Sequence, residues 1–447
     1  MEFSTGVGRS PKRIHVRCRG TARRDATPGR DNTAVHGFGS DERRTGIMGV
    51  ASGPSARTGT KLPRTLILAG ESPLPPRSGL RLRVLYLARE LARSTQVELA
   101  VLGDAEPAPS EPFELRSIPH RNPSRALTAL QAWREPYVVA KQRSSAMAAF
   151  ACAPRWDTVQ VEFPSLVSAA RNASVPVVLD AHNVESDLLR SVADQAPNGP
   201  SRLRLRWEEN KMRRFEQHVA TDVAAVCTTS DADAEVFERW GAAEVVVVPN
   251  GVDTGAIPHR RTPARGAQLL YVGHLGYGPN AAAARDLAQE VLPLVRAQLA
   301  HATVRLVGRD GARLSALAGP HVELAGEVPD MLPELRTARA VVIPLRAGSG
   351  TRLKVLEAMA AGVPIVATPL AVAGIAVRDE EHVLLGTTSG ELAAQVIRVC
   401  RDDALAERLA DEARGLAERT YDWAIVGEPL RALHARLAER SGTRVRT

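Results

Sequence analysis

From residue 64 onward, short apolar runs alternate with segments of helical spacing. Apolar runs bounded by Gly, Pro, Asn or Asp predict buried strands. The predicted strands are 65–69, 97–102, 158–162, 175–180, 224–228, 244–248, 268–272, 303–307, 322–325 and 341–345. The predicted helices include 82–91, 201–219, 279–299, 329–337 and 391–418. Strands that alternate with helices indicate an α/β protein with parallel sheets.

The alternation runs through the chain twice, which predicts two doubly wound, Rossmann-like domains. The first spans 63–253 and the second 268–420, with a linker at 254–267 that is rich in Pro, Arg and Thr. A final helix within 421–447 is predicted to cross back to the first domain. Ligands in such sheets bind beyond the carboxyl ends of the strands. Two facing domains of this kind therefore predict a cleft between them.

Residues 1–62 are rich in Arg, Gly, Thr and Ser and show no apolar periodicity, which predicts a disordered basic tail. This tail carries +7 of the chain's net charge of +8, so the folded body is almost neutral. A nucleic-acid partner is therefore not expected. Met48 lies just upstream of the first predicted strand and is a candidate start of translation. A basic arm that binds a membrane or a partner is the alternative for the tail.

Four cysteines, Cys18, Cys152, Cys227 and Cys400, lie far apart without metal-ligand or redox spacing. This usage favours a reducing cytoplasm. Apolar runs long enough to span a membrane are absent from the sequence. In the predicted helix 201–219, Lys and Arg alternate with apolar residues. This pattern is typical of a solvated, ion-paired helix face. The alternative is that the helix binds the inner face of the membrane as a peripheral contact.

The segment from Val341 to Ile375 carries the clearest chemistry. An apolar run is followed by the small-residue loop 347–350, a helix and a second apolar run. Glycines allow a ligand to approach the backbone, and the free N–H groups of a helix start bind anions. Arg352 and Lys354 in the first turn oppose the helix dipole, a cost that a bound anion would offset. We predict a phosphate site here, with an ordinary turn and solvated charges as the alternative.

Further candidates follow from position. Glu357 lies in the same helix among apolar residues and is predicted to bind ribose hydroxyls, with a surface or ion-paired Glu as the alternative. Gly273 and His274 follow a predicted strand of the second domain, where they would form the other wall of one pocket. A simple tight turn explains this loop equally well.

Two candidates come from the first domain. Gly79 directly precedes a helix and His182 follows a strand, so both should face the cleft. A histidine there can donate a hydrogen bond to a phosphate or a sugar hydroxyl. A structural polar cluster is the alternative.

Several stretches match, in order and spacing, a known family. They are PPRSG at 75–79, LDAHNVE at 179–185, VPNGVD at 248–253, YVG at 271–273, VG at 307–308 and KVLEAMAAGVP at 354–364. With these stretches the chain resembles the retaining glycosyltransferases of family four over roughly residues 64–440. The resemblance implies the GT-B fold, in which two Rossmann-like domains face each other. It also implies that 63–253 is the acceptor domain and 268–420 the nucleotide-sugar donor domain.

The resemblance also implies the chemistry. A nucleotide-diphosphate sugar would be the co-substrate, with no cofactor and no metal, and a glycan or lipid-linked molecule would be the acceptor. Arg352 and Lys354 would hold the pyrophosphate and Glu357 the ribose. Gly79 would let the first domain approach the donor phosphates, and the catalytic candidate His182 would sit beside the transferred sugar. Transfer would proceed by same-face attack without a protein nucleophile.

The sequence departs from the family at one position. Many members carry a pair of glutamates, and the first of the pair contacts the donor sugar. Ser349 occupies that position, next to Gly350, and both residues are predicted to lie in the donor-binding site. The alternatives are a sugar-nucleotide epimerase of the same fold, a nicotinamide-dependent oxidoreductase and an inactive sugar-binding partner. The expected product is a surface polysaccharide or glycolipid made by a hexosyltransferase.

Overall fold

The computed structural model describes residues 62–76, 78–120, 124–348 and 353–444. From Thr60 onward the chain forms one compact unit. The predicted tail up to residue 61, with Met48, and the candidates Ser349, Gly350 and Arg352 lie outside the described residues.

The first half forms a seven-stranded parallel sheet in the order β3-β2-β1-β4-β5-β6-β7. Its strands are β1 (Arg64–Ala69), β2 (Gln96–Leu102), β3 (Glu114–Ile118), β4 (Thr158–Glu162), β5 (Val177–Ala181), β6 (Ala225–Thr228) and β7 (Val245–Val247). Its main helices are α1 (Gly79–Leu91), α2 (Arg125–Ala132), α3 (Tyr137–Gln142), α4 (Ser145–Ala151), α5 (Val167–Ala170), α6 (Glu185–Gln195), α7 (Pro200–Asp222) and α8 (Asp231–Arg239).

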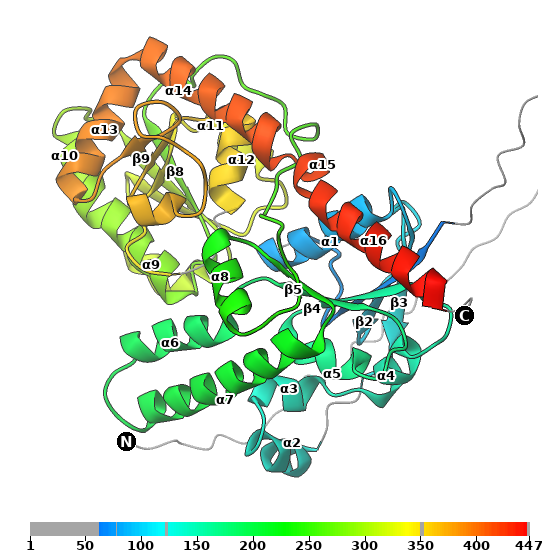
Figure 1. Ribbon diagram of the computed structural model, residues 1–447. Coiled ribbons are helices and arrows are strands. Elements are labelled where there is room, and N and C mark those ends of the chain that lie inside the picture. Colours follow the sequence, from blue (N-terminus) through cyan, green and yellow to red (C-terminus); the bar gives the residue numbers. More distant parts are fainter. Residues whose placement is uncertain (1–61, 77, 121–123, 349–352, 445–447) are drawn as a thin grey trace, which may run out of the picture. The chain divides into compact units, whose positions relative to one another are not determined.

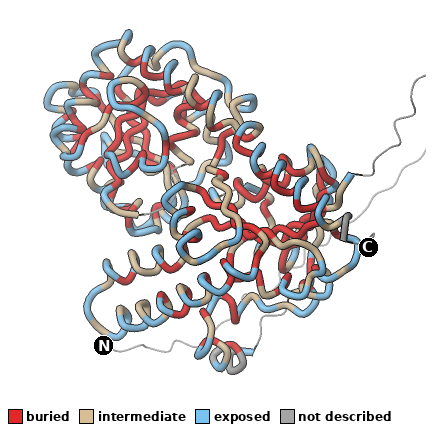
Figure 2. Tube along the Cα trace, in the orientation of Figure 1, coloured by how far each residue is buried: buried red, intermediate tan, exposed pale blue. Residues whose placement is uncertain are grey.

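Both faces of this sheet are buried, as Figure 2 shows. Along β1, Leu66 and Leu68 belong to one apolar core, whereas Ile67 and Ala69 belong to another on the opposite face. The alternation follows from the two-residue period of a strand. It explains why the central strands read as continuous apolar runs. The edge strand β3 is partly exposed, and its mixed sequence gave no such signal.

The second half forms a six-stranded parallel sheet in the order β10-β9-β8-β11-β12-β13. Its strands are β8 (Gln268–Val272), β9 (Thr303–Val307), β10 (Val322–Gly326), β11 (Ala340–Ile343), β12 (Ile365–Ala367) and β13 (Leu384–Leu385). Its main helices are α9 (Gly278–Arg285), α10 (Leu292–Arg296), α11 (Leu332–Thr337), α12 (Leu353–Ala361), α13 (Ser389–Arg401) and α14 (Asp403–Leu416). The prediction of two doubly wound sheets is confirmed (Figure 1).

Each sheet has one point at which the strand order reverses. In the first sheet the chain leaves β1 toward β2 and returns to β4 on its other side. In the second, β8 and β11 have the same relation. Open α/β sheets bind ligands at such switch points, beyond the carboxyl ends of the strands.

The chain ends with α15 (Trp423–Val426) and α16 (Glu428–Arg444). Leu430, Leu433 and Leu437 of α16 are buried in a core that also contains residues of β1 and α1. This last helix therefore packs against the first sheet.

Several boundaries differ from the sequence-based expectation. The single predicted helix 391–418 is divided at Asp402, whose side chain accepts the backbone N–H of Leu405 and caps α14. Helices α2–α6 and α8 were not predicted. Of these, α6 takes its capping carboxylate from another helix, since Glu216 of α7 accepts the N–H groups of Glu185 and Ser186.

Candidate functional site

Two adjoining cavities lie at the switch point of the second sheet. The smaller has a volume of about 220 Å³ and the larger about 450 Å³. Both are lined by Gly79, Gly273, His274, Leu353 and Lys354. The larger one continues to Glu357. The structure thus brings together five of the candidates from the sequence, and these come from both halves of the chain.

Lys354 lies in the first turn of α12 and is held by polar and aromatic groups. Its Nζ donates to Asn280 Oδ1 over 3.2 Å and lies 4.7 Å from the centre of the Tyr271 ring. The Tyr271 hydroxyl donates to the same Asn280 oxygen over 3.0 Å. The ammonium group therefore stands at a defined place beside the N-terminus of α12, where an anion would meet both.

Glycines at two positions permit this close packing. A Cβ atom on Gly273 would lie 3.0 Å from Lys354 Nζ, and one on Gly79 would lie 2.8 Å from Leu353 Cδ1. A larger residue at either position would have to shift the end of the Lys354 or the Leu353 side chain. Both glycines were singled out from the sequence, and the structure supplies this steric reason for each.

Glu357 follows Lys354 by three residues on α12 and lines the larger cavity. Burial raises the pKa of its carboxyl group to about 7, and the charge of Lys354 only partly offsets this. A half-buried carboxylate of this kind gains from hydrogen-bond donors on a ligand, because its own surroundings solvate it poorly.

His274 is engaged within its loop. Its Nε2 lies 2.6 Å from Asp310 Oδ2, and its backbone carbonyl accepts from Asn280 Nδ2 over 3.2 Å. The side chain lines both cavities, so its contact with a ligand would involve the imidazole face or Nδ1.

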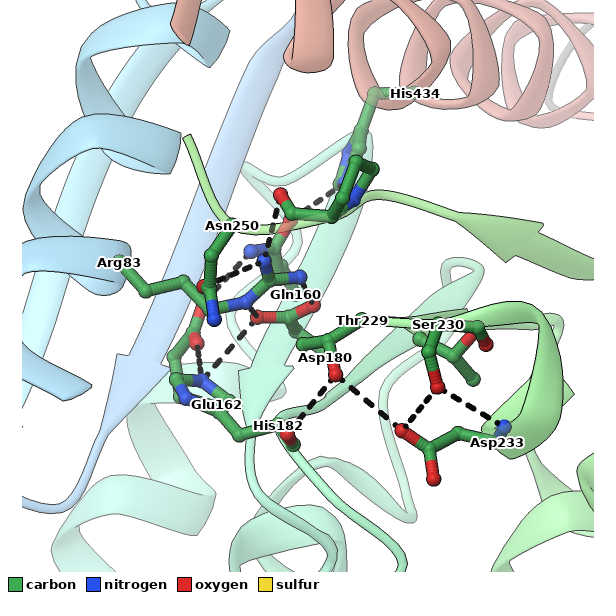
Figure 3. A network of polar contacts seen from close by, with 12 residues as sticks. Arg83, Gln160, Glu162, Asp180, His182, Thr229, Ser230, Asp233, Asn250 and His434 are labelled. Carbon is green, nitrogen blue, oxygen red and sulfur yellow. Dashed lines mark hydrogen bonds and ion pairs between the residues drawn. The ribbon is translucent and has the colours of Figure 1, made fainter. Parts of the chain in front are cut away.

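His182 lies elsewhere. It follows β5, is 8% exposed and is not among the residues that line the two cavities. Its Nε2 lies 2.8 Å from Glu162 Oε2 and 3.2 Å from Asp180 Oδ2 (Figure 3). Burial lowers the pKa of His182, but the hydrogen bonds to Asp180 and Glu162 outweigh it and raise the pKa to about 9. The ring is therefore an imidazolium at neutral pH, with Nδ1 left for other contacts.

Asp180, one of the two carboxylates beside His182, is fixed by Arg83 of α1. This fully buried guanidinium donates to both oxygens of Asp180, over 2.8 and 2.6 Å, and also to Pro249 O. Burial alone would raise the pKa of Asp180, but the charge of Arg83 lowers it well below its usual range. The bidentate pair ties α1, β5 and the turn after β7 together.

The network continues to the C-terminal helix. Gln160 Nε2 donates to Glu162 Oε1 over 2.7 Å, and Gln160 Oε1 accepts from His434 Nε2 over 3.0 Å. His434 Nδ1 lies 2.9 Å from Thr158 Oγ1. Because one ring nitrogen donates and the other accepts, a neutral His434 satisfies both partners.

Glu162, Asp180 and His182 each offer one ligand atom, and these atoms lie within 4.8 Å of one another, close enough to hold a metal ion. Arg83 already pairs with Asp180, and His182 lies between the two carboxylates. The chain's own cations thus balance this cluster, and a metal would have to displace them.

The reasoning from sequence missed Arg83, Glu162 and His434. Arg83 left a usable signal, because it occupies the same helix face as Leu87 and Leu91, which are buried. A charged residue on the core side of a helix predicts a buried partner. The identity of that partner, Asp180, could not be read from spacing.

Comparison with known proteins gives two family matches. Residues 77–256 match the family described as Glycosyltransferase Family 4, and residues 266–402 match the one described as Glycosyl transferases group 1. Together these matches span most of the chain.

Curated relatives match about half of the chain. A phosphatidyl-myo-inositol mannosyltransferase of Mycobacterium leprae is 27% identical over 230 residues, which are 48% of this chain and 60% of the relative. A glycogen synthase of Mycobacterium tuberculosis is 30% identical over 247 residues, 50% of this chain and 56% of the relative. The matched part of the chain thus spans about three fifths of these relatives.

Solved structures match over a larger share. Sucrose-phosphate synthase of Thermosynechococcus elongatus has a TM-score of 0.65 at 18% identity, covering 84% of this chain and 100% of that one. HepE of Anabaena, solved with UDP and glucose, has a TM-score of 0.60 at 16% identity, covering 83% and 99%. These likenesses show a common fold.

Proposed function

The chain belongs to glycosyltransferase family 4 and has the GT-B fold, and on this premise we propose that it transfers a hexose from a nucleoside-diphosphate sugar to a hydroxyl group of a glycan or a lipid-linked acceptor. The observation that carries the proposal is the meeting of Gly79, Gly273, Lys354 and Glu357 at the switch point of the second sheet. Family relatives named for mannosyl transfer and glycogen synthesis support a hexose donor.

The donor would be held by charge and by hydroxyl contacts. Its diphosphate would lie against Lys354 and the N-terminus of α12, because both favour negative charge. The ribose would reach Glu357 in the larger cavity, where its hydroxyls donate to a poorly solvated carboxylate. Arg352 would add a second cation on the diphosphate. These groups would balance the negative charge of the diphosphate, so we propose that transfer needs no metal ion.

The reaction would retain the configuration of the sugar. The bond between the anomeric carbon and the diphosphate oxygen breaks, and the acceptor oxygen bonds to the same face. The acceptor's proton passes to the departing diphosphate. The protein's contribution is then positioning and charge stabilisation. His182 would donate from Nδ1 to a sugar hydroxyl, because two carboxylates hold its Nε2.

The acceptor would reach the protein in the cytoplasm, in part at the membrane surface. Leu130, Trp133 and Leu203 are each more than 70% exposed, and the Trp133 ring lies 5.6 Å from that of Trp207. Such side chains on α2, in the turn after it and on α7, together with the arginines of α7, suit an anionic lipid surface. Among the described helices none is long and apolar enough to cross a membrane.

Binding of nucleoside diphosphates tests the proposal. UDP, GDP and ADP are titrated calorimetrically into the full chain and into Lys354→Ala. We expect at least one to bind and its affinity to fall by about 10- to 100-fold in the variant, since a charge-assisted hydrogen bond contributes about 1.5–3 kcal/mol. Arg336→Ala, which removes an exposed cation from α11, is the matched control. If none of the three binds, or if Lys354→Ala binds as wild type does, the proposal is wrong.

A further inference from the structure

The first sheet has a cavity of its own at the β1/β4 switch point, with a volume of about 350 Å³. Gly70 follows β1 and Phe163 follows β4, and both line it. Its size lies at the lower end of the range for small-ligand sites.

This cavity is adjacent to the proposed donor site. Leu80 lines it, whereas the preceding residue, Gly79, lines the two cavities at Lys354. The ring of Phe163 stacks on the imidazole of His182, with centroids 4.2 Å apart and planes at 20°. A ligand here would therefore lie beside α1 and one aromatic ring away from His182.

The backbone of Phe163 is strained. Its φ of 78° is in the left-handed region, which is a genuine outlier for a bulky side chain. Such strain persists where the surrounding structure enforces it and is concentrated at functional sites. Here it turns the chain after β4 so that Phe163 and Ser165 both line the cavity.

The cavity has one apolar and one polar wall. Leu80, Phe163 and Met212 supply apolar surface. Ser165 Oγ donates to Gln142 Oε1 over 2.7 Å, which leaves the Gln142 amide N–H groups for other partners. Glu185 adds a half-buried carboxylate at the start of α6.

Glu185 is fixed in place by the capping of α6. Glu216 Oε1 accepts the backbone N–H of Glu185 over 2.7 Å, and Oε2 accepts that of Ser186 over 3.1 Å. Burial raises the pKa values of both Glu185 and Glu216, the latter to about 7. Two carboxyl groups therefore stand close together behind this wall.

The charges of the wall would repel an anion. Lysine and arginine are absent from the described residues that line the cavity. Arg81 is near, but it is paired with Glu71, a lining residue, over 2.7 Å. A phosphate placed here would meet carboxylates and no unpaired described cation, whereas a sugar hydroxyl can donate to Glu185.

We propose that this cavity binds the acceptor as an uncharged sugar ring, which donates a hydroxyl to Glu185 and packs against Phe163, and that it rejects a ring bearing a phosphate. The inference rests on the proposed function, because it assigns the second substrate of the same reaction. Polar groups that fix orientation beside an apolar wall are the usual composition of such a site.

Octyl glucoside, octyl galactoside, octyl mannoside and their 6-phosphates are the probes, and saturation-transfer NMR on the full chain gives their affinities. We expect at least one unphosphorylated glycoside to bind, and its 6-phosphate to bind about 10-fold more weakly or less. Glu185→Gln should weaken the unphosphorylated glycoside by about 10-fold, the loss expected for one hydrogen bond to a charged group.

Asp187→Asn, which removes an exposed carboxylate from the same helix, should bind as wild type does. Ser165→Ala is a second variant, which changes the polar wall of the cavity without altering Glu185. The comparison of each glycoside with its 6-phosphate uses wild type alone, so it does not depend on the folding of a variant. The inference is wrong if no unphosphorylated glycoside binds, if the phosphates bind as tightly, or if Glu185→Gln has no effect. Its failure is distinct from that of the proposed function, which would show as absent binding of UDP, GDP and ADP.

Discussion

At the scale of single residues, Glu357 has a carboxyl group whose ionisation affects the free energy of unfolding of the ligand-free protein. Its pKa is raised to about 7 by burial, so the folded chain resists its ionisation. A carboxyl group whose pKa is raised by folding contributes full stability below its unfolded value. That contribution is lost as the pH rises through about 7.

Glu357→Gln should therefore stabilise the ligand-free protein at pH 8 by about 1 kcal/mol, less than the pKa shift alone would give because the side chain is partly exposed. At pH 5 the difference should be smaller. Thermal unfolding at both pH values measures it, with Glu407→Gln on the exposed side of α14 as control. Equal melting temperatures at pH 8 would contradict this reading of Glu357.

His182 gives a second prediction at this scale. Its pKa of about 9 depends on Asp180 and Glu162. The raised value means that its charge stabilises the fold below about pH 6.5 and that this contribution is lost as the pH rises through 9.

Glu162→Gln should lower the pKa of His182 by about one unit or more, because one of its two carboxylate partners becomes neutral. NMR titration of the histidine ring resonances measures the shift. His274, which has a different carboxylate partner, serves as an internal control in the same spectra. An unchanged titration of the His182 resonance in Glu162→Gln would show that Glu162 does not raise the pKa of this ring.

At the scale of elements, α16 is joined to the first sheet by both apolar and polar contacts. Burial lowers the pKa of His434 to about 4, so this ring is neutral in the folded protein. A histidine with a depressed pKa contributes stability above about pH 6.5 and loses it as the pH falls toward 4.

Amide exchange in α16, corrected for intrinsic rates, should therefore be faster at pH 5 than at pH 7. His434→Gln should remove most of this dependence, whereas His301→Gln at an exposed position should keep it. Protection of α16 that is independent of pH in wild type would contradict this account of the helix.

The turn after α2 and the helix α7 supply another test at this scale. Trp133→Ala combined with Trp207→Ala should reduce sedimentation with anionic vesicles severalfold, because both rings offer apolar surface beside arginines. Leu294→Ala removes an exposed apolar residue elsewhere and should have no effect. Equal sedimentation of all three proteins would exclude this surface as the membrane contact.

At the scale of the whole molecule, the sequence was sufficient for what depends on local pattern. The central strands were predicted because both faces of each sheet are buried, which makes their sequences continuously apolar. Lys354 and Glu357 stood out because each breaks a local rule of its helix.

What could not be predicted depends on contacts between distant segments. Arg83 and Asp180 are 97 residues apart, and Gln160 and His434 are 274 apart, so no periodicity relates them. The cavity beside Phe163 likewise forms from strand ends that meet only after the sheet is assembled.

The central claim is that two substrates meet across α1, with the donor at Lys354 and the acceptor at Glu185. The most direct measurement incubates the full chain with a panel of nucleotide sugars and octyl glycosides, and identifies the products by mass spectrometry and by NMR of the new anomeric proton. We predict release of one nucleoside diphosphate for each glycoside extended, with the anomeric configuration of the donor retained. A free epimerised nucleotide sugar formed without acceptor, or no consumption of any nucleotide sugar, would contradict the account.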